Sequence, residues 1–148
     1  MDKIEFTDQY FMKQALQEAR EAFEKDEVPV GAVIASEGTM ICRAHNLTET
    51  LNDVTAHAEM LALTSASEQL GSKFLDNCTL YVTLEPCGMC AGALGWARIG
   101  RLVFGAVDEK RGYQRLSPSP LHPRTEVVSG ILKEECAHLV KQFFSARR

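Results

Sequence analysis

Two short motifs constrain most strongly what this chain can fold into. Thr55-Ala56-His57-Ala58-Glu59 offers an imidazole and a carboxylate, and Pro86-Cys87-Gly88-Met89-Cys90 offers two thiols. Thiols at positions i and i+3 of one helical turn point to the same side. Cysteine and histidine are good zinc ligands, and three of them leave the fourth tetrahedral position open for water. A fold that joins the two motifs therefore makes a catalytic zinc site from His57, Cys87 and Cys90.

Each motif has a less specific interpretation when it stands alone. A Cys-x-x-Cys pair is also typical of a dithiol redox centre or of one half of a four-ligand structural zinc site. A His-x-Glu pair occurs by chance at solvated helix starts. The three remaining thiols, Cys42, Cys78 and Cys136, supply no second Cys-x-x-Cys or Cys-x-x-His motif. The combination favours catalytic zinc, and the redox centre is the non-hydrolytic alternative.

Glu59 is expected to assist the metal without binding it. Two thiolates donate strongly to zinc and weaken its Lewis acidity, so a nearby base that takes the proton of the bound water is useful. On a helix, at about 100° per residue, Glu59 is turned away from His57, which disfavours both as ligands of one ion. The apolar neighbours Met60, Leu61 and Leu63 argue against an exposed glutamate. We therefore expect Glu59 to act as a proton shuttle.

The length and the cysteine usage indicate the broad class of protein. A chain of 148 residues is long enough for one domain with its own core, over residues 1–148. No run of about 18 apolar residues predicts a membrane span, and residues 1–5 lack the apolar centre of a signal peptide. Five cysteines, an odd number that includes two expected metal ligands, favour a reducing, cytoplasmic setting.

The charge is unevenly distributed along the chain. A net charge of −4 argues against a protein that coats nucleic acid through bulk electrostatics. Residues 98–124, however, carry six basic residues against two acidic ones. This segment is either a basic rim for phosphate groups or an ordinary solvated face. Lys141, Arg147 and Arg148 near the C-terminus support the basic rim.

Hydrophobic periodicity predicts a hairpin followed by alternating strands and helices. Glu37-Gly38 is expected to form the hairpin turn, and Thr55 is expected to cap the helix that carries His57. This order predicts an α/β sandwich with a partly parallel sheet, in which both ligand motifs begin helices. The expected helices cover residues 8–25, 55–70, 87–98 and 131–144, and the expected strands cover residues 28–35, 40–42, 78–84, 102–107 and 126–128.

The helix expected over residues 87–98 contains several glycines. Gly88, Gly92 and Gly95 lie along one side, where each is unfavourable in a helix unless something approaches closely. The sheet and a second subunit are the two candidates. Trp96, on the same helix, is either a core residue or an interface anchor, and the core is the default expectation.

Further motifs extend the pattern over nearly the whole chain. They comprise Asn46, residues 27–33, 55–59, 80–87, 89–93, 97–99, 104–106 and 134–136, and the stretch from Phe143-Phe144 to Arg147-Arg148. His-x-Glu with Pro-Cys-x-x-Cys is the signature of zinc nucleobase deaminases. With these motifs, the chain resembles the bacterial tRNA-specific adenosine deaminases of the zinc-dependent cytidine/deoxycytidylate deaminase superfamily.

The resemblance implies both a fold and a reaction. The fold is a three-layer α/β/α sandwich, cytidine-deaminase-like, with a five-stranded mixed sheet, and the protein is a homodimer. The reaction is the hydrolytic deamination of adenosine to inosine at the wobble position of a tRNA anticodon stem-loop, with one Zn²⁺ per chain on the three ligands. Glu59 would move the water proton to the ring nitrogen and then to the departing ammonia. The substrate-binding residues would be Asn46, Val30, Leu84 and the amide of Ala58.

Residues 108–123 depart from the family pattern. The family usually continues here through a Gly-Ala-containing turn into a short helix, but Pro118 and Pro120 oppose a helix in this chain. We expect Arg111, Tyr113 and Arg115 either to stack or pair with an RNA loop or to form an ordinary exposed loop. The altered segment also leaves room for an alternative function, a deaminase of a free base or nucleoside such as guanine or cytosine.

Overall fold

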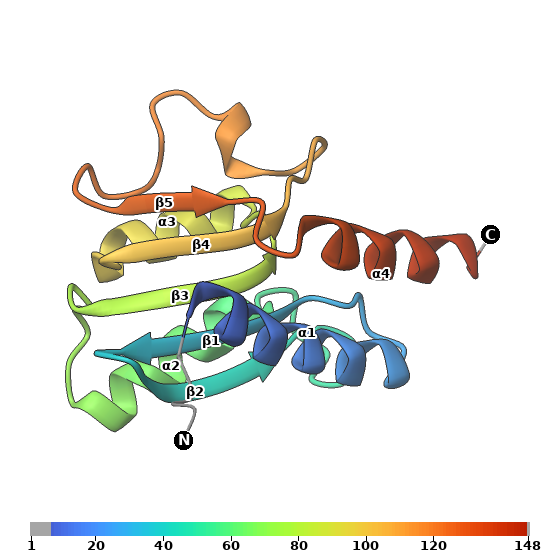
Figure 1. Ribbon diagram of the computed structural model, residues 1–148, viewed down its shortest axis with the longest axis horizontal. Coiled ribbons are helices and arrows are strands. Elements are labelled where there is room, and N and C mark those ends of the chain that lie inside the picture. Colours follow the sequence, from blue (N-terminus) through green and yellow to red (C-terminus); the bar gives the residue numbers. More distant parts are fainter. Residues whose placement is uncertain (1–6, 148) are drawn as a thin grey trace, which may run out of the picture.

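A five-stranded mixed sheet forms the middle layer of the structure, a computed structural model that describes residues 7–147 (Figure 1). The order of the strands is β2-β1-β3-β4-β5, antiparallel from β2 to β3 and parallel from β3 to β5. The strands are β1 (Gly31–Ser36), β2 (Thr39–His45), β3 (Cys78–Leu84), β4 (Arg101–Ala106) and β5 (Glu126–Ser129).

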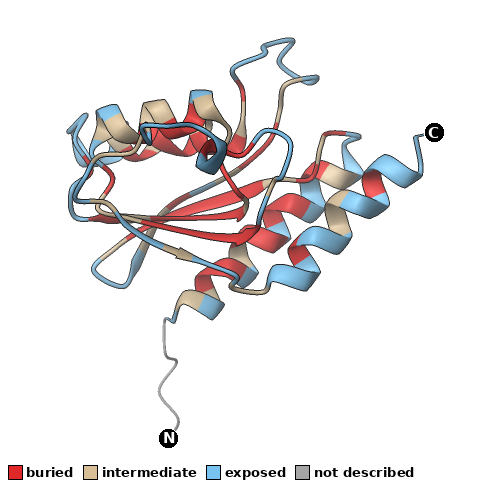
Figure 2. Ribbon diagram, turned by 90° about the horizontal axis from the view of Figure 1, so that it is seen from above, coloured by how far each residue is buried: buried red, intermediate tan, exposed pale blue. Residues whose placement is uncertain are grey.

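Four helices cover the two faces of this sheet (Figures 1 and 2). Helices α1 (Asp8–Glu24) and α4 (Lys133–Ser145) lie on one face, and α2 (Ala58–Leu70) and α3 (Gly88–Ala97) lie on the other. The predicted three-layer α/β/α sandwich with a five-stranded mixed sheet is confirmed. No helix among residues 7–147 is long and apolar enough to cross a membrane, and the motifs at residues 1–5 and at Arg148 lie outside the described part.

The central strand β1 is buried on both sides, as its continuous apolar run predicts. Val33 belongs to the core beneath α1, and its neighbour Ile34 belongs to the core beneath α2 and α3. Both side chains are fully buried. Successive residues of a strand point to opposite faces, so one apolar run serves both hydrophobic layers.

The hairpin between β1 and β2 turns at Glu37 and Gly38, as predicted. Both residues have left-handed backbone conformations, with φ of 52° and 78°. A two-residue turn with positive φ at both positions matches the twist of the flanking strands. Strand β2 is longer than the expected 40–42 and runs on to His45. The extra length carries the chain to Asn46 at the edge of the candidate site.

Helix α3 connects the parallel strands β3 and β4. Because these strands are parallel, their carboxyl ends meet at one edge of the sheet, where ligand sites form in α/β folds. Leu84 at the end of β3 pairs with Ala106 at the end of β4. The segment that follows β4 contains only a short 3-10 turn, Tyr113–Arg115, among residues 108–124. The prediction that this segment lacks a regular helix is confirmed.

Two expectations about α3 were wrong. Trp96 lies at the surface with 86% of its area exposed, because the side of α3 that it occupies faces away from the sheet. The sheet does not approach the glycines either. The Leu116 side chain lies against Gly88, and the Pro120 carbonyl lies against Gly95. The loop after β4 therefore folds back over α3, and its close approach requires that Gly88 and Gly95 have no side chain.

Candidate active site

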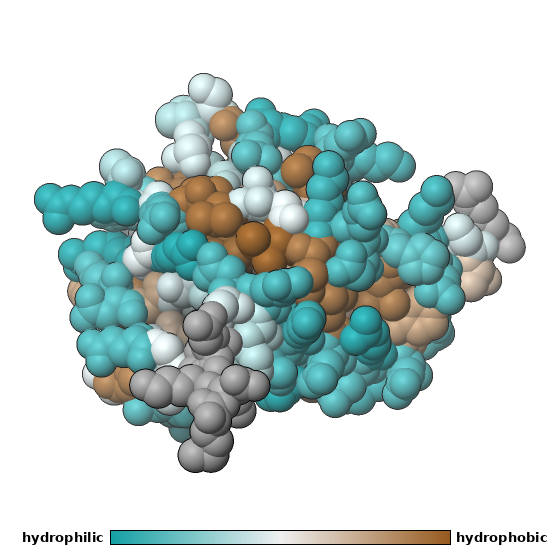
Figure 3. Space-filling model, in the orientation of Figure 1, coloured by the Kyte–Doolittle hydropathy of each residue, from teal (hydrophilic) through white to brown (hydrophobic). Residues whose placement is uncertain are grey.

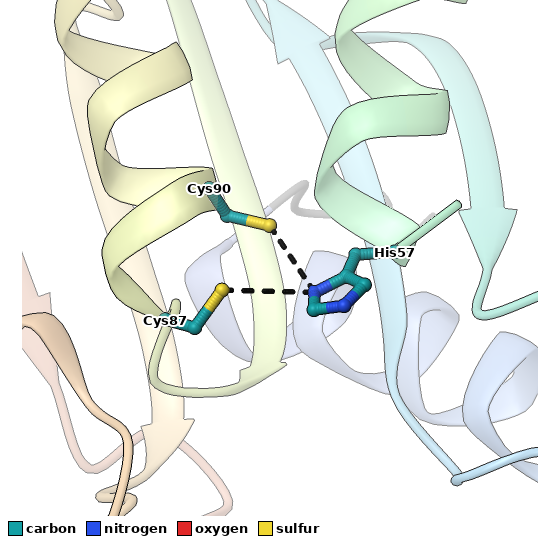
Figure 4. A group of neighbouring side chains, drawn as sticks. All are labelled: His57, Cys87 and Cys90. Carbon is teal, nitrogen blue, oxygen red and sulfur yellow. Dashed lines mark hydrogen bonds between the residues drawn. The ribbon is translucent and has the colours of Figure 1, made fainter. Parts of the chain in front are cut away.

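The three expected metal ligands meet between the starts of α2 and α3 (Figure 4). His57 is the residue that precedes α2, Cys87 precedes α3, and Cys90 lies in the first turn of α3. Figure 4 shows both sulfurs directed at the imidazole. The expectation that Thr55 caps α2 was wrong, because Thr55 hydrogen-bonds to Asp53 and the helix begins later. Both ligand motifs nevertheless begin helices, as predicted.

The separations of the ligand atoms fit a tetrahedral zinc ion. The Nδ1 atom of His57 lies 3.7 Å from the sulfur of Cys87 and 3.5 Å from that of Cys90. Zinc bonds of about 2.3 Å to sulfur and about 2.0–2.1 Å to nitrogen place two tetrahedral ligand atoms about 3.6 Å apart. The site is therefore consistent with a zinc ion held through Nδ1 of the histidine.

The two thiols affect each other's protonation in a way that suits a cation. A hydrogen bond from Cys90 lowers the pKa of Cys87 to about 3, and the neighbouring His57 acts in the same direction. The same contact with Cys87 raises the pKa of Cys90. Only one of the two sulfurs is thus readily charged by itself. A divalent cation favours both thiolates, which is the donor set that zinc requires.

Glu59 lies beside these ligands in the first turn of α2 and is buried. Burial disfavours its charged form and raises the pKa of the carboxyl to about 7, although nearby His57 opposes the shift. A carboxyl with such a pKa can both accept and release a proton near neutral pH. The expectation that Glu59 is not an exposed helix glutamate is confirmed.

A cavity of about 1030 Å³ opens next to this cluster. Its walls come from the segment before β1, the loop after β2, the start of α2, the ends of β3 and β4, the loop after β4, and α4. A separate groove of about 390 Å³ between α1 and α4 contains none of the expected site residues. The larger cavity is the one that joins the possible metal ligands to open solvent.

A model of the MafB19-like deaminase family matches residues 6–148 of the chain. The chain belongs to this family. The tRNA-specific adenosine deaminase of Bacillus subtilis (strain 168) is 47% identical over 146 residues, which cover 95% of this chain and 91% of that protein. The tRNA-specific adenosine deaminase of Aquifex aeolicus (strain VF5) is 48% identical over 145 residues, which cover 95% of each protein.

Similarity to solved structures supports the assignment of this chain to the MafB19-like deaminase family. A structure from studies of A-to-I editing by tRNA:A34 deaminases superposes with a TM-score of 0.83 at 47% identity, covering 88% of this chain and 98% of that chain. A guanine deaminase from Bacillus subtilis superposes less completely, with a TM-score of 0.63 at 41% identity, covering 66% of this chain and 62% of that chain. The cytidine-deaminase-like fold expected from the sequence is thereby confirmed.

The cavity of this MafB19-like deaminase collects seven of the eight residues singled out from the sequence. Cys90, which is fully buried, is the exception. The residues that line the cavity are Val30, Asn46, His57, Ala58, Glu59, Leu84 and Cys87.

Sequence reasoning missed the contribution of α4 to the deaminase cavity. Val140 and Phe144 line it together with Ala137, and none of these three residues was singled out from the sequence as a site residue. The spacing of 137, 140, 141 and 144 is a helical stripe that could have signalled a second functional face. Half of the area of Phe144 remains exposed to solvent.

Only part of the expected basic rim of the deaminase lies at the cavity. Lys110, Arg111 and Lys141 line it. Arg98 instead stacks on the Phe74 ring, with its guanidinium 3.7 Å from the ring centre. Arg101, at the start of β4, forms an ion pair with Asp8 of α1. The segment is thus divided between a rim and structural contacts, because its residues lie at opposite ends of the sheet.

Tyr113 fits neither interpretation offered for the loop after β4. It is 4% exposed and packs edge-on against Phe104, with ring centres 6.3 Å apart. It is therefore part of the core beneath α3 and is neither an RNA-stacking residue nor an exposed loop residue. Its burial anchors the loop that follows Arg111.

Proposed function

We propose that this chain hydrolyses adenosine to inosine at the wobble position of a tRNA anticodon stem-loop. The observation that carries the proposal is the cluster of His57, Cys87 and Cys90 with zinc-compatible separations beside the buried Glu59. The similarity to tRNA-specific adenosine deaminases over 95% of the chain supports adenosine in tRNA as the substrate.

The dimensions and charge of the cavity support an RNA loop over a free base. Its volume of about 1030 Å³ lies slightly above the range of about 300–1,000 Å³ that is typical of small-molecule sites. Its lining is mixed in charge: Asp108 and Glu109 lie beside Lys110, Arg111 and Lys141, and these three cations suit the phosphates of a nucleic acid backbone. A free base offers no phosphate to these cations.

His57, Cys87 and Cys90 would hold one zinc ion per chain. When bound, zinc lowers the pKa of a water so that the water can attack as hydroxide near neutral pH. Glu59 would accept the proton of this water, deliver it to the purine ring nitrogen, and assist the departure of ammonia. The burial that raises the pKa of Glu59 to about 7 suits both directions of proton transfer.

Four further residues would bind the flipped nucleotide. Val30 and Leu84 are partly buried apolar side chains of the cavity wall, suited to the faces of a base. The amide of Ala58 belongs to the first turn of α2, whose N–H groups have no acceptor within the helix and can bind a base edge. Asn46 lines the cavity, while its side chain also contacts the Val28 carbonyl at 3.3 Å.

The direct test compares substrates side by side. The purified, zinc-loaded protein is incubated with an anticodon stem-loop that carries adenosine at the wobble position, and with free guanine, adenine and cytosine. We expect inosine in the RNA and unchanged free bases. The partial similarity to a guanine deaminase makes guanine the relevant competitor. Deamination of guanine with unreacted RNA would reject the proposal in favour of a free-base enzyme.

We also propose that the chain acts as a single deaminase domain, that two chains form a homodimer and that the protein is cytoplasmic. The ten residues of α3 are all Gly, Ala, Cys, Met, Leu or Trp, although Met89 and Trp96 face outward, with 40% and 86% of their areas exposed. A helix that is apolar on all sides is typically buried on all sides. A second copy over this face would bury it. Thiolate zinc ligands favour a reducing compartment.

A further inference from the structure

Two buried carboxylates outside the expected catalytic group lie close to the cavity, and Glu85 is one of its lining residues. Glu27 is fully buried before β1, and Glu85 is 3% exposed directly after β3. Neither forms an ion pair with lysine or arginine among residues 7–147. Burying a carboxylate is costly unless hydrogen bonds compensate for the lost water. Their partners therefore indicate what each carboxylate does.

Glu27 holds the loop after β2. Its carboxylate accepts hydrogen bonds from the backbone N–H groups of Glu49 and Thr50, at 3.0 and 2.6 Å, and from the Thr50 hydroxyl at 2.7 Å. These donors lower the pKa of Glu27 in spite of its burial, so the group remains charged. The same loop supplies Asn46 and Thr48 to the cavity wall.

Glu85 holds the loop after β4 in the same manner. Its two oxygens accept the backbone N–H groups of Asp108, at 3.0 Å, and Gln114, at 2.9 Å. Gly112 passes directly over the carboxylate, where a methyl group would overlap it. This loop supplies Lys110 and Arg111 to the cavity wall.

The loop after β4 is also bonded to Pro86 and Cys87, the residues directly before α3. Gly112 forms a β-bridge with Cys87, and the N–H of Tyr113 donates to the Pro86 carbonyl at 2.9 Å. Glu85 lies directly before Pro86. The loop with the altered sequence is thus fixed relative to the ligands by the β-bridge, by the Tyr113 hydrogen bond and by the two hydrogen bonds to the Glu85 carboxylate.

We propose that Glu27 and Glu85 are positioning residues for substrate binding, each fixing one wall of the cavity through the backbone amides of a loop. The inference rests on the proposed RNA deamination for its kinetic consequence. Only an acceptor group can satisfy two converging N–H donors, so glutamine, with one oxygen and a donating NH₂, is a poor replacement of nearly equal shape. Loops that are already ordered lose less conformational entropy when they bind RNA.

The first experiment measures hydrogen exchange in the zinc-loaded variants Glu27→Gln and Glu85→Gln. We expect Glu27→Gln to speed amide exchange about tenfold or more in residues 47–51 and to leave residues 108–114 unchanged, because local opening follows the loss of local contacts. Glu85→Gln should give the reverse pattern. Each variant is the control for the other, and Glu68→Gln, an exposed site on α2, controls for the loss of one charge. Equal exchange in both loops, or no change, would overturn the inference.

The second experiment measures kinetics with the anticodon stem-loop. We expect each variant to raise KM about fivefold or more while kcat changes less than about threefold, the pattern of lost binding that is common to ground state and transition state. Zinc content should stay at the wild-type level. Unchanged KM in a variant whose loop exchanges faster would reject the positioning role. Failure of the wild-type protein to deaminate the RNA would reject the proposed function instead, and the exchange result would still stand.

Gly112→Ala provides a third variant, which keeps both glutamates in the sequence and acts on Glu85 from the loop side. The added methyl group should displace the Glu85 carboxylate and speed exchange in residues 108–114. Adding Gly112→Ala to Glu85→Gln should then cause little further change, because contacting residues are not additive. Additive effects of the two substitutions would show that the carboxylate does not hold this loop.

Discussion

Glu59 and the two site cysteines derive their chemistry from position on the first turns of two helices. Burial raises the pKa of Glu59. The hydrogen bond between Cys87 and Cys90 lowers the pKa of Cys87 and raises that of Cys90. None of these residues has unusual chemistry in water. Their environment suits each to its proposed function, that of a proton carrier for Glu59 and of metal ligands for the two cysteines.

Replacing Glu59 by alanine separates these functions. We expect Glu59→Ala to retain zinc and to lose roughly 10³-fold or more of the deamination rate, within the range usual for a lost general acid–base group. Inosine formation and elemental analysis measure the two effects. A variant that lost its zinc would identify Glu59 as a ligand and contradict the assigned role.

Replacing Cys87 by alanine tests the metal site itself. Because zinc binding stabilises the folded state that supplies the ligands, we expect Cys87→Ala to retain less than about a tenth of the zinc and to melt at a lower temperature. Cys78→Ala, which removes a buried thiol in β3 away from the site, should keep the zinc. Wild-type protein with no bound metal and a disulfide that cycles with reductant would instead support the dithiol alternative.

At the scale of the elements, the parallel pair β3 and β4 has the largest effect on function. Its crossover helix α3 begins at the carboxyl end of β3 and brings Cys87 and Cys90 to the edge that also receives the loop after β4. Helix α1 supports this arrangement from the opposite face of the sheet. Its first residue, Asp8, is bound by Arg101 at 2.6 and 2.7 Å and by the Tyr81 hydroxyl at 2.8 Å.

This attachment of α1 predicts a pH-dependent contribution to stability. The Arg101 guanidinium lowers the pKa of Asp8 below its usual value of about 3.9. A lowered folded-state pKa means that the contribution is present above the unfolded-state pKa and is lost as the pH falls through the folded-state pKa. We expect Asp8→Asn to cost about 1 kcal/mol near neutral pH, because solvent screens part of the ion pair.

Denaturant unfolding of the wild-type and Asp8→Asn proteins checks this expectation. The difference in the free energy of unfolding should be constant between about pH 5 and pH 7 and should shrink toward zero below about pH 3. A difference that does not vary with pH would assign the effect to packing and would contradict the ion pair as its source.

At the scale of the whole molecule, the two faces differ in surface character. Figure 3 shows the face that carries α1 and α4, which is largely hydrophilic with hydrophobic side chains gathered in a band near its centre. On the opposite layer, α3 has no charged residue and presents Trp96 to solvent. The proposed second copy would cover this helix and lie close to the metal ligands at its start.

Replacing Trp96 by glutamate tests the proposed dimer. A buried and unpaired charge is costly, so we expect Trp96→Glu to have the mass of one chain in light scattering at concentrations where the wild-type protein has the mass of two. Val127→Glu, at a partly exposed apolar site on β5, should leave the dimer intact. A wild-type protein that remains monomeric would contradict the proposal.

The sequence alone determined which three residues form the zinc-compatible cluster, the glutamate beside them, the hairpin turn and the order of strands and helices. These features depend on residue type and on spacing within one turn or one strand, where local geometry limits the possibilities. The proximity of His57 to Cys87 could be predicted only from their chemistry, because histidine and cysteine are typical ligands of one zinc ion.

The tertiary structure decided which side chains face the cavity, the core or solvent. Trp96 lies outside and Tyr113 inside, α4 contributes Phe144 to the cavity, and Glu27 and Glu85 hold loops that follow them by more than twenty positions. Such placements depend on contacts between segments that are distant in the sequence. Apart from the helical stripe on α4, local periodicity does not record them, because the same side chain is stable in either environment until its partners are in place.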